Sequence, residues 1–502
     1  MIPLLSVRQL RQVEARTIAQ GVPALDLMER ASAHCVDRLL GLYPASKPIV
    51  VLCGMGNNGG DGLVMAKLLQ RLGRSVRVVV APHRTQGSPE FETQLARCRS
   101  VGIDPVQWDE GQLDMPFSSD DLVVDALLGS GLDRPLAGVM RTVVAKLLEM
   151  RPEVIAIDRP TGWGVEEPAA DRFCVRATHT FVLELPEYRM LLPDEAPFIG
   201  RIHVLPIGLD ADAIRAEPTN YYRLEPSDVR ALLPYRASQA HKGSFGHALL
   251  MAGGPGKVGA ALLATQAALR SGSGLITLRT TAGNEVLVHA SAPEALVSVD
   301  AGGEALSIPP ELTAYSAIGI GPGIGTAEAT AKLLKHLVQE VRVPLVLDAD
   351  ALNLLALNST WVPFLPPGSI LTPHPKEFDR LAGSSSSSVE RLERAQAFAQ
   401  KNRVILVLKG GPTAICSPDG RVFFNPTGNV GMAKGGSGDC LTGIITALCA
   451  QGLPPEAAAL AGVYVHGSAG DLAAAALGTQ GMLPTDLIAA LPQAWERVRT
   501  SA

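Results

Sequence analysis

One glycine-rich segment, residues 428–443, carries the side chain best placed to do chemistry. It reads GNVGMAKGGSGDCLTG, and Asp439 ends the glycine run where we expect a helix over residues 441–450. Glycines let backbone N–H groups approach anionic oxygens, and the positive end of a helix dipole favours negative charge. A carboxylate there can take the proton from a hydroxyl that attacks a phosphoryl group. The pattern predicts phosphoryl transfer; the alternative is that Asp439 only caps the helix.

Other segments of the second half are rich in glycine or polar residues and adjoin successive predicted strands. These segments are residues 241–246, 253–260, 319–325, 347–352 and 372–377. A single polar residue at a strand end is more often a turn residue, but this succession predicts one crevice at a sheet edge. Lys409 follows another strand, so we expect it beside the Asp439 helix with an adenine nucleotide between them.

The first half contains a second glycine loop, residues 54–59, which reads GMGNNG. It matches the dinucleotide-binding pattern G-x-G-x-x-G, but the second strand ends in VAPH without the acid that would hold a ribose. The side-chain oxygens of Asn58, Asp125 and Thr161 could instead converge on a hard cation from three strand ends.

Composition narrows the class of protein. The chain has 502 residues, of which 47% are hydrophobic and 19% charged, which predicts a globular enzyme of at least two domains. A net charge of −5 disfavours nucleic acid and anionic membranes as partners. The seven cysteines form no C-x-x-C pair, which favours a reducing cytoplasm over disulfides or zinc. We expect no signal peptide and no membrane segment.

Alternating strands and helices predict two α/β domains. In the first half we expect helices within residues 7–40, strands at 49–53, 76–80, 122–125 and 154–158, and a helix at 63–72. In the second half we expect strands at 248–252, 275–278, 317–320, 345–347, 370–372 and 404–408. Near residue 215 the alternation of strands and helices stops and charged residues become more frequent. We therefore assign residues 1–212 and 231–502 to domains and residues 213–230 to a linker.

Four motifs of the first half carry a family resemblance. They are residues 27–31 (LMERA), 57–62 (NNGGDG), 125–132 (DALLGSGL) and 158–162 (DRPTG). With them, residues 1–212 resemble the YjeF N-terminal domain, the NAD(P)H-hydrate epimerase family, which implies a Rossmann-like three-layer sheet. The resemblance implies Asp158 as catalytic acid or base and K⁺ held by Asn58, Asp125 and Thr161. It implies substrate contacts from Asn57, Asn58, Gly59, Gly60, Asp61, Gly129, Ser130, Gly131, Leu132, Asp133, Arg134, Pro135 and Asp158.

Two departures from the family pattern bear on this first site. Where the family usually has Asp-Ile-Pro-Ser-Gly, this chain has Asp-Arg-Pro-Thr-Gly, which places Arg159 directly after Asp158. The family's later strand usually leads into a Lys-Pro-Gly-like segment, but here no lysine occurs from Phe173 to Gly200. Arg159 could weaken Asp158 as a base or pair with a substrate phosphate. A folded binding module without catalysis is the alternative for this half.

The second half carries a resemblance through motifs in family order, residues 241–246, 372–377, 409–413 and 435–443. Residues 235–495 resemble the ADP/ATP-dependent NAD(P)H-hydrate dehydratases, which implies a ribokinase-like, doubly wound sheet. The resemblance implies Ala260, Gly323, His374 and Asp439 at the hydrated nicotinamide, with Asp439 as the base. It implies Lys409, Gly410, Gly411, Pro412, Thr413 and Gly438 at the nucleotide.

Together the resemblances imply repair of hydrated NADH and NADPH, called NAD(P)HX. The first domain would interconvert the R and S epimers, and the second would dehydrate the S epimer with ADP as co-substrate, ATP being possible, and Mg²⁺. We expect a homo-oligomer. The alternative is a ribokinase-like vitamin or sugar kinase with a non-catalytic first module, which would not require His241, Lys242, Gly243 or His374.

Overall fold

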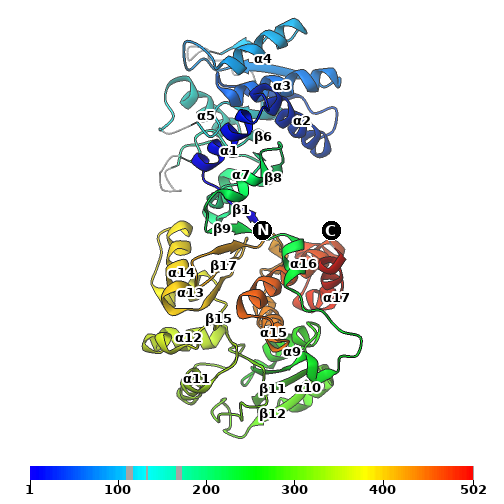
Figure 1. The fold of residues 1–502 in the computed structure, drawn as a ribbon, viewed down its shortest axis with the longest axis vertical. Coiled ribbons are helices and arrows are strands. Elements are labelled where there is room, and N and C mark those ends of the chain that lie inside the picture. Colours follow the sequence, from blue (N-terminus) through cyan, green and yellow to red (C-terminus); the bar gives the residue numbers. More distant parts are fainter. Residues whose placement is uncertain (109–116, 132–133, 165–171, 501–502) are drawn as a thin grey trace. The chain divides into compact units, whose positions relative to one another are not determined.

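The computed structural model describes residues 1–108, 117–131, 134–164 and 172–500, which form two compact α/β units (Figure 1). The first unit is Pro3–Thr219, and the second is Asn220–Ala502 together with Met1–Ile2. The boundary falls inside residues 213–230, for which the sequence predicts a linker. That stretch nevertheless folds, because it contains the end of α7 (Ala211–Ala216), strand β9 (Tyr221–Arg223) and most of α8 (Pro226–Leu232).

The first unit is built on seven parallel strands in the order β4-β3-β2-β5-β6-β7-β8. Its strands are β2 (Ile49–Cys53), β3 (Val76–Val80), β4 (Val106–Gln107), β5 (Leu122–Ala126), β6 (Glu153–Ile157), β7 (His179–Leu183) and β8 (Arg201–Leu205). Its other helices are α1 (Val7–Ala19), α2 (Ala24–Leu42), α3 (Asn57–Arg71), α4 (Pro89–Ser100), α5 (Gly138–Met150) and α6 (Ala196–Ile199). Every residue of β2 and β5 is buried, as continuous apolar runs in a covered parallel sheet should be.

Helix α3 begins six residues earlier than the sequence predicts, so the NNGGDG motif is helical rather than a turn. Close packing explains why glycines occupy these helical positions. A Cβ added at Gly59 would lie 1.8 Å from the carbonyl oxygen of Gly54, and one at Gly62 would lie 2.7 Å from the Ala126 Cβ. The glycines let the helix start lie directly on the ends of β2 and β5.

The second unit contains an eleven-stranded sheet in the order β1-β9-β18-β17-β16-β15-β14-β13-β10-β11-β12. Its strands are β1 (Ile2–Pro3), β9, β10 (His247–Met251), β11 (Leu275–Thr281), β12 (Leu296–Asp300), β13 (Ala317–Ile320), β14 (Leu345–Leu347), β15 (Ile370–Leu371), β16 (Ile405–Leu408), β17 (Ala414–Cys416) and β18 (Val422–Phe424). Strands β10 to β16 are parallel neighbours, whereas β17 runs antiparallel to both β16 and β18. The sequence missed this hairpin, whose strands are three residues long, and the edge strand β12.

One large core of the second unit is formed by the sheet with α8, α9 (Val258–Leu269), α10 (Glu285–Ser291), α15 (Ser437–Ala450), α16 (Pro455–Gly481) and α17 (Pro484–Thr500). The other helices of this unit are α11 (Glu328–Glu340), α12 (Ala349–Leu357), α13 (Pro375–Ala382) and α14 (Ser388–Asn402). Helix α15 lies beside α9 (Figure 1), and a Cβ added at Gly443 would lie 2.0 Å from the Ala264 carbonyl oxygen. Helix α15 starts at Ser437, so Asp439 lies in its first turn rather than before it.

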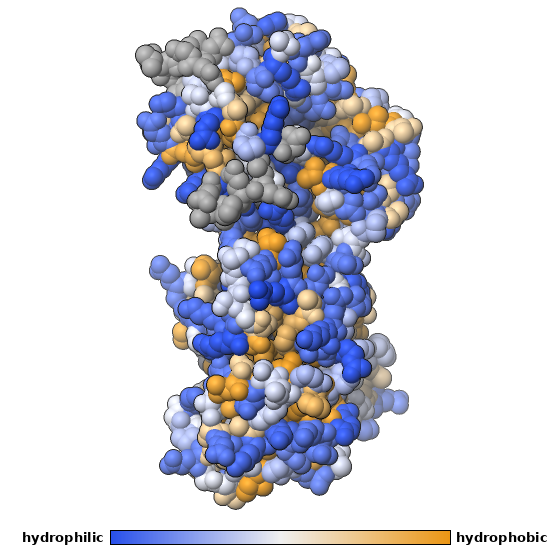
Figure 2. Space-filling view, turned by 90° about the vertical axis from the view of Figure 1, so that its left-hand side faces the viewer, coloured by the Kyte–Doolittle hydropathy of each residue, from blue (hydrophilic) through white to orange (hydrophobic). Residues whose placement is uncertain are grey.

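Figure 2 shows one face, where hydrophobic residues gather in separate patches among hydrophilic ones. No helix within the described ranges is both long and apolar enough to cross a membrane.

Candidate active sites

A pocket of about 1320 Å³ opens at the carboxyl ends of β2, β5 and β6 in the first unit. The predicted residues that line it are Asn57, Asn58, Asp61, Gly129, Ser130, Gly131, Arg134, Pro135 and Asp158. Gly59 and Gly60 belong to the same helix, α3, but do not line the pocket, and Gly60 packs against the Met28 side chain. Leu132 and Asp133 lie outside the described residues.

Asp158 is held firmly at the wall of this pocket. It follows β6 and has a φ of +64°, a left-handed conformation that is rare for residues other than glycine. The Ser130 backbone N–H donates to Asp158 Oδ2 at 3.1 Å. A Cβ added at Gly129 would lie 3.3 Å from the same oxygen and 3.2 Å from Asn58 Cγ. The loop after β5 therefore approaches the carboxylate through its glycine.

Two more carboxyl groups face Asp158 in the pocket. Burial raises the pKa of Asp61 well above its usual range, and Asp158 and Glu14 raise it further. Burial also raises the pKa of Glu14, with Asp158 as the next cause and Arg11 opposing it. A carboxyl group with a raised pKa keeps its proton to a higher pH than an ordinary one, so Asp61 and Glu14 are candidate proton donors in this pocket.

Three arginines also line the pocket; the sequence predicts Arg134 among the substrate contacts but not Arg11 or Arg84. Arg11 comes from α1, Arg84 follows β3, and Arg134 follows β5. A Cβ added at Gly56 would lie 2.7 Å from Arg84 Nη2, so this guanidinium lies against the start of α3. The position of Arg84 just beyond the carboxyl end of a predicted strand was the available signal. Guanidinium groups suit phosphate oxygens.

The predicted cation ligands are only partly brought together. Thr161 Oγ1 and N donate to Asp125 Oδ1 and Oδ2 at 2.7 and 2.8 Å. Burial raises the pKa of Asp125 to about 6, and the hydrogen bonds from Thr161 oppose the rise. Asn58 lies beside Gly129, and its buried Nδ2 has no hydrogen-bond partner among the described residues. A buried carboxylate and an unsatisfied amide that can flip its oxygen inward fit a bound cation.

The second unit gathers charged residues at the carboxyl ends of β14, β15 and β16, beside the start of α15. Lys409 Nζ lies 2.8 Å from Asp348 Oδ1 and 3.8 Å from Glu377 Oε2. Burial lowers the pKa of Lys409, but Asp348 and Glu377 raise it more, so the ammonium is retained. A Cβ added at Gly438 would lie 3.3 Å from Lys409 Nζ. The lysine thus reaches the first turn of α15, as the sequence predicts.

Asp439 has the electrostatic setting of a general base. Burial raises the pKa of Asp439 to about 6, Asp348 adds to the rise, and Lys409 opposes it. Gly436, with a φ of +101°, turns the chain into the helix just before it. A base with a pKa near the working pH transfers protons efficiently.

Asp348 and Thr442 are site residues to which the sequence assigns no role, although Asp348 belongs to segment 347–352 of the predicted crevice. Thr442 Oγ1 donates to Asp348 Oδ2 at 2.8 Å, so Asp348 joins α15 to Lys409, the residue directly after β16. The signal for Asp348 was its position directly after a predicted strand. Thr442 lies one helical turn beyond Asp439, on the same face, but its partner 94 residues away could not be read from the sequence.

Ala260 and Gly323 come together on the other side of this region. A Cβ added at Gly323 would lie 3.4 Å from the Ala260 Cβ and 2.9 Å from the Lys257 Cβ. Lys257 Nζ lies 3.1 Å from Asp350 Oδ2, an oxygen that also accepts the Gly325 N–H at 2.8 Å. Asp350 in turn contributes to the raised pKa of Asp439. These contacts connect the predicted nicotinamide residues to the Asp439 region.

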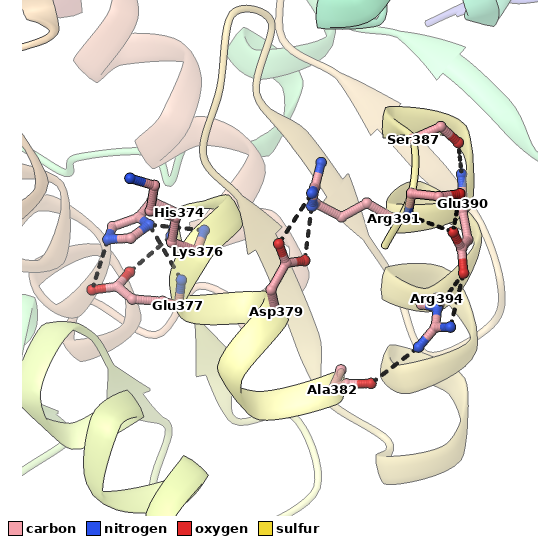
Figure 3. A network of polar contacts seen from close by, with 10 residues as sticks. His374, Lys376, Glu377, Asp379, Ala382, Ser387, Glu390, Arg391 and Arg394 are labelled. Carbon is pink, nitrogen blue, oxygen red and sulfur yellow. Dashed lines mark hydrogen bonds and ion pairs between the residues drawn. The ribbon is translucent and has the colours of Figure 1, made fainter. Parts of the chain in front are cut away.

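His374 caps α13 (Figure 3). Its Nδ1 accepts the N–H groups of Lys376 and Glu377 at 3.1 and 3.3 Å, and Glu377 Oε2 accepts the His374 N–H at 2.8 Å. Figure 3 also shows Asp379 joined to Arg391 of α14 at 2.9 and 3.0 Å. The capping role fixes the imidazole next to Glu377 and hence near Lys409.

The predicted nucleotide segment forms the turn between β16 and β17. It contains Lys409, Gly410, Gly411, Pro412 and Thr413, with a cis peptide bond before Pro412. Thr413 Oγ1 donates to the Gly410 carbonyl oxygen at 3.0 Å. Lys409 brings this turn to the start of α15, next to Gly438.

Residues 241–246 do not face this site, contrary to the sequence-based expectation. They precede β10 at the amino end of the sheet, where a Cβ added at Gly246 would lie 1.8 Å from the Ala450 carbonyl oxygen. Ala450 ends α15, so about 16 Å of helix separates this segment from Asp439. His241 Nδ1 accepts the Gly243 N–H at 3.1 Å, a local cap. Residues 241–246 therefore do not contact the Asp439 site, and they do not help to distinguish a dehydratase from a kinase.

Each half of the chain matches a known protein family. Residues 24–188 match the family model described as YjeF-related protein N-terminus, and residues 248–493 match that of NAD(P)H-hydrate dehydratase. The bifunctional NAD(P)H-hydrate repair enzyme Nnr of Coxiella burnetii is 38% identical, covering 97% of this chain and 98% of its own. The corresponding Moorella thermoacetica enzyme is 36% identical, covering 94% and 92%.

One solved structure resembles the second unit. It is the ADP/ATP-dependent NAD(P)H-hydrate dehydratase of Bacillus subtilis, co-crystallised with ATP and Mg²⁺. The match has 37% sequence identity and a TM-score of 0.50, and it covers 56% of this chain and 100% of that chain.

Proposed function

This chain belongs to the family of bifunctional NAD(P)H-hydrate repair enzymes, and we propose that it returns NADHX and NADPHX to NADH and NADPH. In this proposal the first unit interconverts the R and S epimers. The second unit dehydrates the S epimer with ADP as co-substrate, and ATP is the other candidate nucleotide.

One observation carries the dehydratase assignment: Asp439, with a pKa near 6, lies in the first turn of α15 beside Lys409. Backbone N–H groups at this helix start and the Lys409 ammonium can bind phosphate oxygens, while Asp439 accepts a proton. We propose that residues 409–413 and Gly438 contact the nucleotide. Ala260, Gly323 and His374 would contact the hydrated nicotinamide.

The proposed reaction converts a poor leaving group into a good one. Asp439 takes the proton of the ring hydroxyl, whose oxygen attacks the β-phosphorus of ADP, and the bond from phosphorus to AMP breaks. The resulting phosphate ester loses phosphate as the ring nitrogen donates its electron pair. Loss of a proton from the adjacent ring carbon restores the double bond. One ADP is thus consumed, yielding NAD(P)H, AMP and phosphate.

Mg²⁺ would screen the phosphates of the bound nucleotide. The described residues contain no cluster of three His, Cys, Asp or Glu side chains arranged to hold a metal ion. Both oxygens of Asp348 are already hydrogen-bonded, to Lys409 and Thr442. We therefore propose that Mg²⁺ is held mainly by the nucleotide's own phosphates, as is common for this ion.

In the first unit we propose Asp158 as the acid or base at the ring. The arginines that line the pocket would hold the phosphates, and K⁺ would bind at Asn58, Asp125 and Thr161. A cation there would relieve the cost of burying the Asp125 carboxylate. We propose that the protein acts in the cytoplasm as a homo-oligomer; its seven free, buried cysteines suit a reducing compartment.

The test follows the absorbance of reduced nicotinamide after the full-length protein is mixed with purified NADHX epimers and Mg²⁺. Each epimer is given ADP, ATP or no nucleotide. We expect nucleotide-dependent recovery from the S epimer, and complete recovery from the R epimer faster than it epimerises spontaneously. Failure with the S epimer and either nucleotide would refute the dehydratase and favour a small-molecule kinase. Recovery from R at the spontaneous rate would refute the epimerase.

A further inference from the structure

Arg159 is a cation directly after the proposed catalytic Asp158, and the sequence left two roles open for it. It could weaken the carboxylate as a base, or it could bind a phosphate of the substrate. The contacts of its side chain distinguish these roles.

The Arg159 guanidinium lies between two carboxylates. Its side chain is only 6% exposed, its Nε lies 3.4 Å from Asp158 Oδ2, and its Nη2 lies 2.9 Å from Glu187 Oε1. The guanidinium carbon also lies 5.6 Å from the centre of the Trp163 ring. Burial lowers the pKa of Arg159, but Asp158 and Glu187 raise it more, so the buried charge is kept.

The pair lies behind the catalytic carboxylate rather than in the pocket. Asp158 lines the pocket, whereas neither Arg159 nor Glu187 is among the described residues that line it. The cations that do line it, Arg11, Arg84 and Arg134, are separate side chains. A phosphate of the substrate would meet those arginines, and Arg159 is already occupied by its two carboxylates.

We propose that Arg159 and Glu187 form a buried ion pair that positions the Asp158 carboxylate for epimerisation. This inference rests on the proposed function of the first unit. Arg159 and Glu187 are positioning residues, because they act through Asp158 without facing the pocket.

The backbone explains why Asp158 needs such support. Its left-handed φ of +64° is costly for a residue with a Cβ, so the surrounding contacts must hold it. The Ser130 N–H approaches Oδ2 from the pocket side, and the Arg159 guanidinium approaches the same oxygen. The Glu187 carboxylate forms an ion pair with Nη2 at the far end of the guanidinium. Removing one partner of a buried pair leaves an uncompensated charge.

The test compares kcat and KM for epimerisation of the R epimer in the full-length protein. Asp158→Ala protein in excess supplies the dehydratase for the coupled assay. For Arg159→Met we expect kcat about 10- to 100-fold lower with KM changed less than about 3-fold, as for a displaced catalytic group. Arg159→Lys should recover part of kcat. Arg84→Gln, in the pocket, is the contrasting variant and should mainly raise KM.

A double variant separates positioning from folding. Arg159→Met alone leaves the buried Glu187 without its ion-pair partner and with only the weaker attraction of Arg189, so its first unit should melt at a lower temperature. Arg159→Met/Glu187→Gln removes both charges and should regain much of that stability while its kcat stays low. Dehydration of the S epimer by the same proteins checks that the second unit is intact.

Three outcomes would overturn the inference: a raised KM with unchanged kcat in Arg159→Met, unchanged values of both, or recovery of kcat in the double variant. A wild-type protein that does not accelerate epimerisation would refute the proposed function before any variant is compared. The stability difference between the single and double variants reports the ion pair separately from activity.

Discussion

Replacing Asp439 with asparagine should inactivate the second unit and stabilise it at the same time. The native pKa of about 6 exceeds the ordinary aspartate value of 3.8, so the folded protein binds a proton more tightly than the unfolded chain. The free energy of unfolding therefore falls as pH rises from about 4 to 6, and the loss persists above pH 6. The difference corresponds to about 3 kcal/mol at neutral pH, as an upper estimate.

Asp439→Asn removes this charge and should raise the melting temperature of the second unit at pH 8, but not at pH 4. The pKa of about 6 already includes the opposing attraction to Lys409, and the figure worked from it is an upper estimate, so we expect about 1–2 kcal/mol, a rise of a few degrees for a unit of this size. Calorimetry can assign the transition, because ADP with Mg²⁺ stabilises only the unit that binds it. Glu340→Gln, an exposed carboxyl on α11, is the matched control and should change neither transition.

The same variant tests catalysis. A lost general base should lower kcat at least about 100-fold, while ADP binding stays within a few-fold. Turnover retained in Asp439→Asn would refute the mechanism. A melting temperature equal to or below the wild type at pH 8 would refute the electrostatic account of Asp439.

Three further predictions concern the first unit. Asp158→Ala should abolish epimerisation and leave dehydration unchanged, and loss of both activities in a folded protein would argue against independent sites. KCl, compared with NaCl, should raise the melting temperature of the first unit above pH 6, where the Asp125 carboxylate is ionised, and Asp125→Asn should remove this difference. Gly59→Ala should destabilise the unit by more than about 2 kcal/mol because its Cβ would meet backbone, whereas Gly41→Ala in α2 has open space and should be neutral or stabilising; equal urea midpoints would contradict the packing argument.

Most strands could be predicted closely because they are continuous apolar runs. Strand β2 matches its predicted range of 49–53, and β13 and β14 match 317–320 and 345–347. Burial on both faces leaves little ambiguity in such runs. The short hairpin strands β17 and β18 offer too few residues for a pattern.

Helix starts were harder to predict wherever glycines serve packing. The motif from Asn57 to Gly62 reads as a turn by composition, but its glycines sit in α3 because neighbouring backbone leaves no room for a Cβ. The candidate site of the second unit could likewise be predicted only in part. Asp439 and Lys409 followed from local motifs, whereas the partnership of Asp348 with Thr442 depends on which strand ends lie next to α15.

Strand β1 has a consequence for any attempt to study the units apart. Because Ile2 belongs with the second unit and β1 lies beside β9, the first unit is inserted into the second rather than simply preceding it. A fragment starting at Asn220 would leave the edge of β9 bare, and uncovered strand edges invite intermolecular pairing. Such a fragment should aggregate more readily than one in which residues 1–3 are rejoined ahead of β9 through a short flexible connection. The second unit is therefore better isolated by removing the inserted first unit than by truncating the chain before Asn220.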